Sequence, residues 1–362
     1  MNDKIGMVTF FRDNYGAFLQ AYALQQVLIS YGFKPELINY DFRRENAIVG
    51  IPIKSIQNPF VFAKRIVVNI IKYPWHQRRE SAFKNDINEL LILSKKYDKY
   101  KDLLKAKMPY FLCLTGSDQM FNPLIQPQSF YFRMLCFCNC YKASYAASSG
   151  KQSLEADYLP FFKNELEKYV GVSVREKSLC NYISKELGVD AIYNIDPSLL
   201  LNASQWKKIS KPTNYGKYIF VYLAGFQKEV IEKTNVLSSK LGLPVLVADR
   251  DYKMNNQIKR KKYLRPTEWL DAIYNAEYVV TNSFHGTAFC INFHKKALII
   301  ATGKRNERLL DLIHNCNVDR LLNDTIINDE ELLNLYDDAD SYLEKERRKS
   351  FEYISSFKRF IA

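Results

Sequence analysis

The sequence lacks long hydrophobic runs, and this absence limits where the protein can act. Nothing in the 362 residues approaches the roughly 18 consecutive apolar residues that a membrane-spanning helix needs. The first residues, MNDKIGMVTFFRDNYG, carry an acid and several polar groups without a long apolar core, which argues against a secretory signal peptide. We therefore expect a cytoplasmic protein that is soluble or peripheral to the membrane.

Paired cysteines and histidine clusters are also missing. The seven cysteines are odd in number and irregularly spaced, which is typical of a reducing compartment and not of a disulfide framework. Cys136, Cys138 and Cys140 alternate at period two, so a strand would place their thiols on one face. Three thiolates can hold a soft metal, but no nearby histidine-rich or paired-cysteine segment completes a site. We interpret them as small hydrophobic residues in a strand and expect neither a metal nor a cofactor.

Acidic residues are too few to balance the basic ones. Lysine and arginine number 52 against 39 aspartates and glutamates, which gives a net charge of +13. This excess favours an anionic partner, and nucleic acid, an anionic membrane surface and a phosphorylated substrate all satisfy it. Zinc-finger spacing, RNA-binding aromatic motifs and a helix-turn-helix are absent, so we expect no nucleic acid.

Short apolar runs alternate with helical stretches along the chain. This alternation predicts an α/β protein with parallel sheets, and the length favours two domains. We place the first domain at 1–205, a linker at 206–216 and the second domain at 217–328. The remaining residues, 329–362, have helical period, and we expect this tail to pack back on the first domain. The expected strands are 4–10, 33–41, 108–115, 142–149, 169–175, 189–195, 217–225, 243–249, 277–282 and 296–301.

Loops that follow strands carry the candidate functional residues, because ligands bind beyond the carboxyl ends of strands in open parallel sheets. His285 follows the run EYVVTN, and Gly286 after it allows close approach of a ligand to a helix start whose free amides favour an anion. An imidazole has a pKa of about 6.5, so beside an anion it can be cationic and donate a proton. The alternative is a structural histidine bonded to a neighbouring carbonyl.

A second loop, TGSDQMFNP, collects Gly116, Ser117, Asp118 and Gln119 after an apolar strand. Its hydroxyl, carboxylate and carboxamide suit the recognition of a polyhydroxyl compound or a phosphate. They suit a helix cap equally well, because Ser and Asp commonly close the first turn of a helix.

Two further loops add candidates. Arg175 ends the run VGVSV, where its guanidinium either binds a carboxylate or phosphate through two bonds or pairs with Glu176 at the surface. Asn14, Tyr15 and Gly16 precede the first expected helix, and without a full GxGxxG they indicate a dinucleotide site only weakly.

The segments DNYGAFLQAYALQ, GSDQMFNP, YAASSG, SVREKS, DPSLLL, VVTNSFHGTAF and RNERLLDLI follow one another along most of the chain. In this order they resemble the polysaccharide pyruvyl transferase family. The resemblance implies a GT-B-like fold of two Rossmann-like domains, with the acceptor on the first and the donor on the second. It also implies transfer of a pyruvate ketal from phosphoenolpyruvate to neighbouring hydroxyls of a sugar, in a cell-surface polysaccharide such as a capsule or exopolysaccharide, or in its lipid-linked precursor.

The resemblance assigns roles to particular residues. His285 and Arg175 match the family's donor-site motifs, whereas Ser283 stands where other branches have an arginine. We expect Arg308, or Lys304 with Arg305, to supply the missing cation.

Ketal formation needs an acid that protonates the enol methylene, a cationic clamp and a base. We expect His285 to be the acid, Arg175 the clamp and Asp118 the base. A nucleotide-sugar glycosyltransferase and a noncatalytic sugar-binding protein are the rival functions, because a two-domain architecture alone does not specify the donor.

A basic and aromatic segment, 60–80, raises a question about the membrane. Arg65, Lys72 and Arg79 recur every seven residues, with aromatic residues between them. The segment either rests on an anionic membrane beside a lipid-linked acceptor or forms an ordinary core-facing helix, and Pro74 favours the second because it would interrupt a continuous membrane helix.

Overall fold

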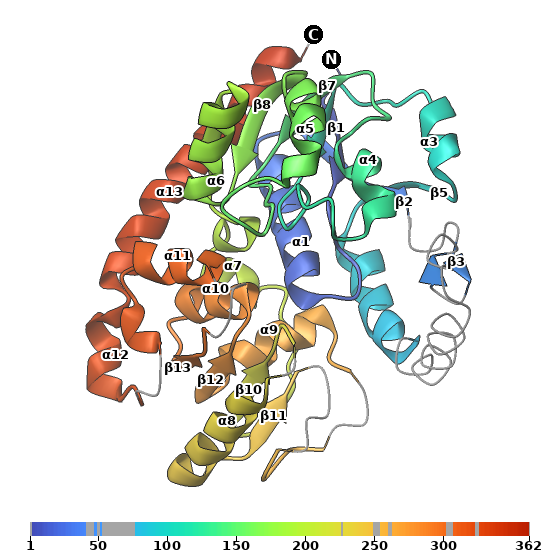
Figure 1. The fold of residues 1–362 in the computed structure, drawn as a ribbon. Helices are drawn as coiled ribbons and strands as arrows, with labels where there is room; N and C mark the ends of the chain where they lie inside the picture. Colours follow the sequence, from blue (N-terminus) through green and yellow to red (C-terminus); the bar gives the residue numbers. More distant parts are fainter. Residues whose placement is uncertain are drawn as a thin grey trace.

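Two parallel sheets covered by helices form the protein (Figure 1). The computed structural model describes residues 2–40, 47–48, 51–52, 77–225, 227–248, 254–259, 263–301, 307–322 and 326–361. Arg65 and Lys72 of the basic segment lie outside these residues, as do Lys304 and Arg305. Within them, no helix is long and apolar enough to cross a membrane. The predicted α/β class is confirmed.

The larger sheet has the strand order β5-β2-β1-β6-β7-β8-β9, and all its pairs are parallel. Its strands are β1 (Lys4–Val8), β2 (Lys34–Tyr40), β5 (Leu93–Tyr97), β6 (Leu112–Thr115), β7 (Tyr141–Ser144), β8 (Tyr169–Val174) and β9 (Ala191–Tyr193). The direction of strand addition reverses between β1 and β6, which creates a crevice beyond their carboxyl ends.

The smaller sheet has the order β11-β10-β12-β13 and is also parallel. Its strands are β10 (Ile219–Tyr222), β11 (Val245–Val247), β12 (Tyr278–Thr281) and β13 (Ala297–Ile299). The reversal lies between β10 and β12, so this sheet has a second crevice of the same kind. A separate antiparallel pair joins β3 (Ala47–Ile48) to β4 (Ile51–Pro52).

Helices cover the sheets and connect their strands. The described helices are α1 (Tyr15–Ser30), the helical residues 77–90, α3 (Tyr100–Lys105), α4 (Phe130–Arg133), α5 (Leu159–Leu166), α6 (Lys177–Tyr182), α7 (Ala203–Lys207), α8 (Lys228–Leu241), α9 (Pro266–Tyr274), α10 (Phe284–Asn292), α11 (Glu307–Asn315), α12 (Asp329–Leu335) and α13 (Asp337–Ser356). Helix α6 continues as a π-helical turn, Ile183–Leu187. Short 3-10 turns occur elsewhere, among them η5 (Pro197–Leu199).

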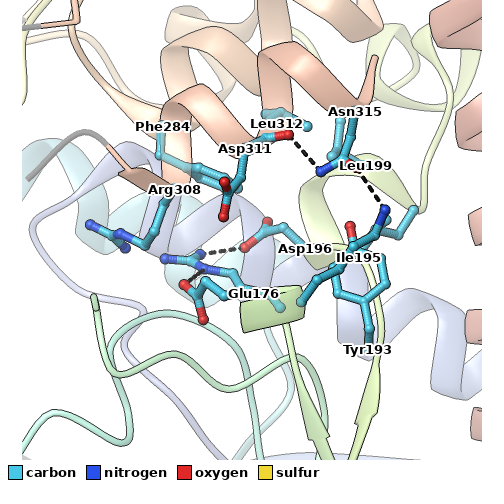
Figure 2. Close-up of a pocket in the computed structure, with 12 residues that line it drawn as sticks. Glu176, Tyr193, Ile195, Asp196, Leu199, Phe284, Arg308, Asp311, Leu312 and Asn315 are labelled. Carbon is cyan, nitrogen blue, oxygen red and sulfur yellow. Dashed lines mark hydrogen bonds and ion pairs between the residues drawn. The ribbon is translucent and has the colours of Figure 1, made fainter. Parts of the chain in front are cut away.

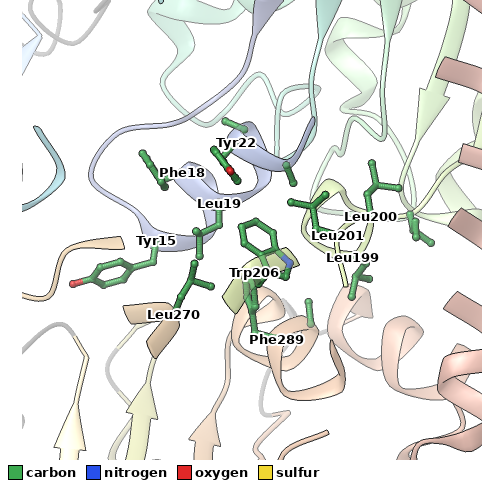
Figure 3. Close-up of a cluster of buried hydrophobic side chains, with 14 of the residues drawn as sticks. Tyr15, Phe18, Leu19, Tyr22, Leu199, Leu200, Leu201, Trp206, Leu270 and Phe289 are labelled. Atoms are coloured by element: carbon green, nitrogen blue, oxygen red, sulfur yellow. The ribbon is translucent and has the colours of Figure 1, made fainter. Parts of the chain in front are cut away.

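Helix α1 joins the two sheets into one core. It begins after Asn14, whose side-chain oxygen accepts the amide hydrogen of Ala17 at 3.0 Å. Nearly all of its residues are buried, as expected for a helix that is apolar on every side. Figure 3 shows its residues Tyr15, Phe18, Leu19 and Tyr22 in the same cluster as Trp206, Leu270 and Phe289. The apolar core is therefore continuous from one sheet to the other.

A polar clamp reinforces this contact between the two halves. Asp86, in the helical residues 77–90, is fully buried and accepts hydrogen bonds from Arg265 Nε at 2.7 Å and from the Thr267 amide at 2.8 Å. Its carboxylate therefore sits at the amino end of α9, where a negative charge is favoured.

The carboxyl-terminal helix, α13, lies against the larger sheet (Figure 1). Tyr353 donates a hydrogen bond to the carbonyl of Ser144 in β7 at 2.8 Å, and Asn194 donates one to Ser350 at 3.3 Å. Trp206, which opens the expected linker, lies in α7 and is fully buried.

The expected strand through the cysteines is wrong. Residues 136–140 form turns, because Leu135 takes a left-handed conformation (φ 55°) after α4 and the chain enters β7 only at Tyr141. The three thiols consequently do not share a strand face.

Candidate active site between the two sheets

A cavity of about 370 Å³ lies where the crevices of the two sheets face each other. Its lining comes largely from loops that follow the four strands at the reversal points, β1 and β6 in one sheet and β10 and β12 in the other. The lining residues are Asn14, Arg79, Asp118, Gln119, Tyr222, Leu223, Ala224, Gly225, Ser283, Phe284, His285 and Arg308. A ligand of sugar-phosphate size fits such a volume.

Arg175 sits at the end of β8 with its side chain only 2 % exposed, close to three carboxylates. Its Nη1 donates to Asp196 at 2.6 Å, its Nε lies 3.4 Å from Glu176, and its Nη2 lies 3.8 Å from Asp118. Burial opposes the positive charge, but these carboxylates outweigh burial and raise the pKa of Arg175. The Nη2 atom has no hydrogen-bond partner among the described residues.

Asp196 is the centre of this charge network, and the sequence interpretation did not select it. It accepts hydrogen bonds from Ser117 Oγ at 2.8 Å and from the amide and hydroxyl of Ser198 at 2.9 and 2.7 Å. Burial would raise its pKa, but the charges of His285 and Arg175 and these bonds lower it to about 2. The sequence signal that could have identified Asp196 is DPS after a strand-like run, because its aspartate caps the turn η5 beyond β9.

His285 is the second residue of α10 and faces the same network from the other sheet. Its Nε2 lies 3.9 Å from Asp196 Oδ2 and has no hydrogen-bond partner in the described part of the chain. Burial lowers the pKa of His285, the charge of Asp196 opposes that shift, and the charge of Arg175 adds to it. The imidazole therefore favours its neutral form until another anion comes near.

Two glycines make room for this histidine and its helix. A Cβ on Gly16 would lie 2.2 Å from both Cγ and Nδ1 of His285, so the start of α1 packs directly on the imidazole ring. A Cβ on Gly286 would lie 2.2 Å from the Thr281 hydroxyl, which fixes how closely α10 starts beyond β12. Ser283 caps α10, its Oγ accepting the Gly286 amide at 3.4 Å, and borders the cavity.

Arg308, in α11, supplies a second guanidinium. Arg308 lines the small pocket of Figure 2 together with Phe284, Asp311, Glu176 and Asp196. Burial lowers the pKa of Arg308, and its Nε has no hydrogen-bond partner among the described residues. The pocket in Figure 2 encloses only about 20 Å³, room for one water, so an anion must enter the larger cavity that Arg308 also lines.

A sequence model described as Polysaccharide pyruvyl transferase matches residues 14–304, a range that contains the cavity-lining residues from Asn14 to His285. The chain belongs to the polysaccharide pyruvyl transferase family. No curated protein matches it.

The solved structures that resemble this pyruvyl transferase family member share its fold at low identity. UDP-N-acetylglucosamine 2-epimerase from Rickettsia bellii has a TM-score of 0.52 and 10 % identity, with 99 % of each chain covered. UDP-GlcNAc 2-epimerase from Methanocaldococcus jannaschii has a TM-score of 0.51 and 10 % identity, over 99 % of this chain and 100 % of that one. The co-structure of S. aureus MnaA with UDP has a TM-score of 0.52 and 10 % identity, over 99 % and 96 %. They confirm the GT-B-like architecture.

Not every predicted residue of this pyruvyl transferase family member reaches the cavity. Tyr15 is fully buried, stacks on Trp269 and donates to the carbonyl of Leu264 at 3.0 Å, so it supports the core. Gly116 packs against Thr9, where a Cβ would lie 2.9 Å from the Thr9 Cβ.

The other residues of the same loop divide between support and lining. Ser117 donates a hydrogen bond to Asp196 and does not line the cavity, whereas Asp118 and Gln119 line it. The Gln119 side-chain oxygen accepts a hydrogen bond from Asn122 at 3.0 Å, which leaves its amide nitrogen available to a ligand. Asn14 lines the cavity and also caps α1.

Proposed function

We propose that this protein transfers a pyruvate ketal from phosphoenolpyruvate to two neighbouring hydroxyls of a sugar. The observation that carries the proposal is His285, a buried imidazole whose Nε2 has no hydrogen-bond partner among the described residues, at a cavity between the sheets that the guanidinium of Arg308 also lines. Membership of the family supports the transferase reaction, and the cavity offers an acid, cations and a carboxylate within one space.

The reaction balances with the groups at hand. A proton adds to the methylene carbon of phosphoenolpyruvate, and a sugar hydroxyl adds to the carbon that bears the phosphate. Phosphate then leaves, and the second hydroxyl closes the ketal ring. Of the two hydroxyl protons released, one replaces the proton consumed at the methylene, and the other leaves on the phosphate.

His285 acts as the acid in this scheme. The donor brings a carboxylate and a phosphate, and their negative charge raises the pKa of a neighbouring imidazole. Protonation of His285 is therefore coupled to donor binding, because burial and the nearby guanidiniums hold its pKa down beforehand. His285 therefore carries the proton only in the complex with the donor, where the enol can receive it.

Asp118 acts as the base and Arg175 with Arg308 as the clamp. Asp118 is 20 % exposed at the cavity, whereas Asp196 is completely enclosed, so only Asp118 can receive a hydroxyl proton from the acceptor. Arg308 Nε at the cavity has no hydrogen-bond partner among the described residues, and neither has Nη2 of Arg175, which borders the small adjoining pocket and not the cavity itself. In this proposal charge-assisted bonds to the donor satisfy both atoms.

Replacement of His285 tests this function. His285→Ala should lower turnover by roughly a hundredfold to ten-thousandfold, the usual range for a positioned acid. His294→Ala is the matched control, because His294 lies at the surface and pairs with Asp340 at 2.9 Å. Near-normal turnover of a folded His285→Ala protein would remove this residue from the role of acid.

Calorimetry with phosphoenolpyruvate and a panel of nucleotide sugars tests the donor. We expect phosphoenolpyruvate to bind and nucleotide sugars not to bind. The reverse result would indicate a glycosyltransferase, and no binding of either would indicate a sugar-binding protein.

The acceptor, in this proposal, is a sugar of a cell-surface polysaccharide or of its lipid-linked precursor, met at the cytoplasmic face of the membrane. Sedimentation with anionic liposomes at low and high salt tests membrane contact. The variant changes Arg65 and Lys72 to Glu and keeps Arg79, because Arg79 lines the cavity. Equal sedimentation of wild type and variant would exclude this segment as the contact.

A further inference from the structure

Cys113 and the later pair Cys138 and Cys140 gather on the larger sheet, and none of the three lines the cavity. The sulfur atoms of Cys113, Cys138 and Cys140 all lie within 4.8 Å of one another, and those of Cys138 and Cys140 lie 3.0 Å apart. Cys113 is in β6, and the other two belong to the turn before β7, the strand that pairs with β6. Cys136 does not join them.

The spacing suits a metal. Zinc binds a thiolate at about 2.3 Å, so two sulfurs on one tetrahedral zinc lie about 3.8 Å apart, within the range that this group spans. All seven cysteines are free thiols. No histidine or carboxylate among the described residues joins the three sulfurs, so solvent or a small ligand would fill a fourth position. Donors made only of sulfur select thiophilic ions.

We propose that Cys113, Cys138 and Cys140 bind one thiophilic d¹⁰ cation, such as zinc, as three thiolates. Cys113 and Cys138 are buried, while Cys140 is partly exposed and gives the ion a way in. The pairing of Cys113 with the later C-x-C follows from the parallel register of β6 with β7, which the sequence spacing does not reveal.

The site is structural and not catalytic. Gly116 begins the cavity loop three residues beyond Cys113, or about 10 Å along a strand, so the ion does not reach the reacting groups. The chain between Cys113 and Cys138 carries Asp118 and Gln119. An ion held by both cysteines would therefore close the base of the loop that presents these two residues to the cavity.

Titration of the reduced protein with Cd²⁺ alone tests the proposal, because cadmium thiolates absorb in the ultraviolet by charge transfer. We expect the absorption to saturate at one equivalent. Cd²⁺ should produce the same band when it displaces Zn²⁺ from the zinc-loaded protein, and Zn²⁺ alone should raise the melting temperature. Cys140→Ser, a change at a partly exposed position, should weaken Cd²⁺ binding at least tenfold and abolish the thermal shift. Cys138→Ser should do the same.

Cys136→Ser is the matched control, since this cysteine lies in the same turn without joining the group, and it should bind Cd²⁺ as the wild type does. Absence of the charge-transfer band would overturn the proposal, as would a folded Cys140→Ser protein that binds like the wild type. Loss of binding in Cys136→Ser would also overturn it. So would a Cys138–Cys140 disulfide that persists in the reductant.

Discussion

Charged side chains on the two sides of the cavity differ in whether they have ionic partners within the protein. Behind the lining contributed by the larger sheet, Asp196 and Arg175 are enclosed and paired, and ionic hydrogen bonds within the protein offset the cost of their burial. On the wall of the smaller sheet, His285 and Arg308 are buried without such partners among the described residues, and burial lowers the pKa of both. In the proposed function, the side with His285 and Arg308 therefore makes the larger change in its charge interactions when the anionic donor binds.

Loss of the central acid should have the largest effect on stability. Asp196→Asn removes the carboxylate that faces Arg175 and His285, and breaking a buried pair typically costs about 3–5 kcal/mol. Asp118→Asn, at a partly exposed position, should cost about 1 kcal/mol or less. Urea unfolding of both variants checks this, and equal losses would mean that the larger sheet's wall is not organised around Asp196.

The stability of the wild type should show a matching acid transition. The pKa of Asp196 in the folded protein is lowered from 3.8 to about 2, so its contribution is complete above pH 3.8 and declines as pH falls toward 2. The Asp196→Asn protein should lose less stability over this window than the wild type. Parallel pH profiles from urea unfolding would contradict the assignment.

Gly16→Ala tests the contact between the start of α1 and the His285 ring. The added Cβ would require His285 to move, and a misplacement of about 1 Å can cost roughly a hundredfold in rate. We expect turnover to fall by about that factor while donor affinity changes less. In the His285→Ala background the same change should add little, and a full additional loss there would show that Gly16 acts independently of the histidine.

A smaller effect is expected from the second wall's guanidinium. Arg308→Ala should weaken phosphoenolpyruvate binding about tenfold, the effect of one lost charge-assisted bond. Arg320→Ala serves as control, because Arg320 is half exposed and pairs with Glu331. Calorimetry that gives the same affinity for both variants would place the anion elsewhere.

Donor binding should also take up a fraction of a proton, which is the smallest effect. Because an anion raises the pKa of His285, phosphoenolpyruvate should bind more weakly as pH rises through the pKa of the complex. Calorimetry in buffers of different ionisation enthalpy measures this proton uptake. The uptake by the His285→Ala protein gives the part that comes from the donor's own ionisable groups, and this part is subtracted. Equal uptake by both proteins would contradict a coupled histidine.

The apolar alternation of the sequence predicts most of the fold for a physical reason. Strands of a parallel sheet are buried on both faces and read as continuous apolar runs, as IFVY of β10 does. β5, LSKKY, has no continuous apolar run because it is an edge strand whose lysines face solvent. The run around Cys138 looks like a strand in the sequence and is not one, since Leu135 takes a left-handed conformation and the chain turns there.

The residues that line the cavity were predictable where they follow strand ends, and the contacts that depend on packing were not. His285, Asp118 and Ser283 line the cavity because loops after strands converge there. Asp196 bonds Ser117 across 79 positions of sequence, a pairing that no spacing shows. Tyr15 looks like a loop residue in the sequence, yet its ring stacks on Trp269 from the other half.

The attachment of α13 to the larger sheet has a consequence for synthesis. That sheet is complete once β9 has left the ribosome, but the hydroxyl that bonds Ser144 belongs to Tyr353. At about 5–20 residues per second, the helix follows β9 by roughly 10–30 s. During that interval the surface beneath it, including Tyr31, which later contacts Phe351 at 5.9 Å between ring centroids, faces the cellular milieu. Nascent chains paused before α13 should therefore bind chaperones that recognise aromatic surface, and release them as α13 emerges.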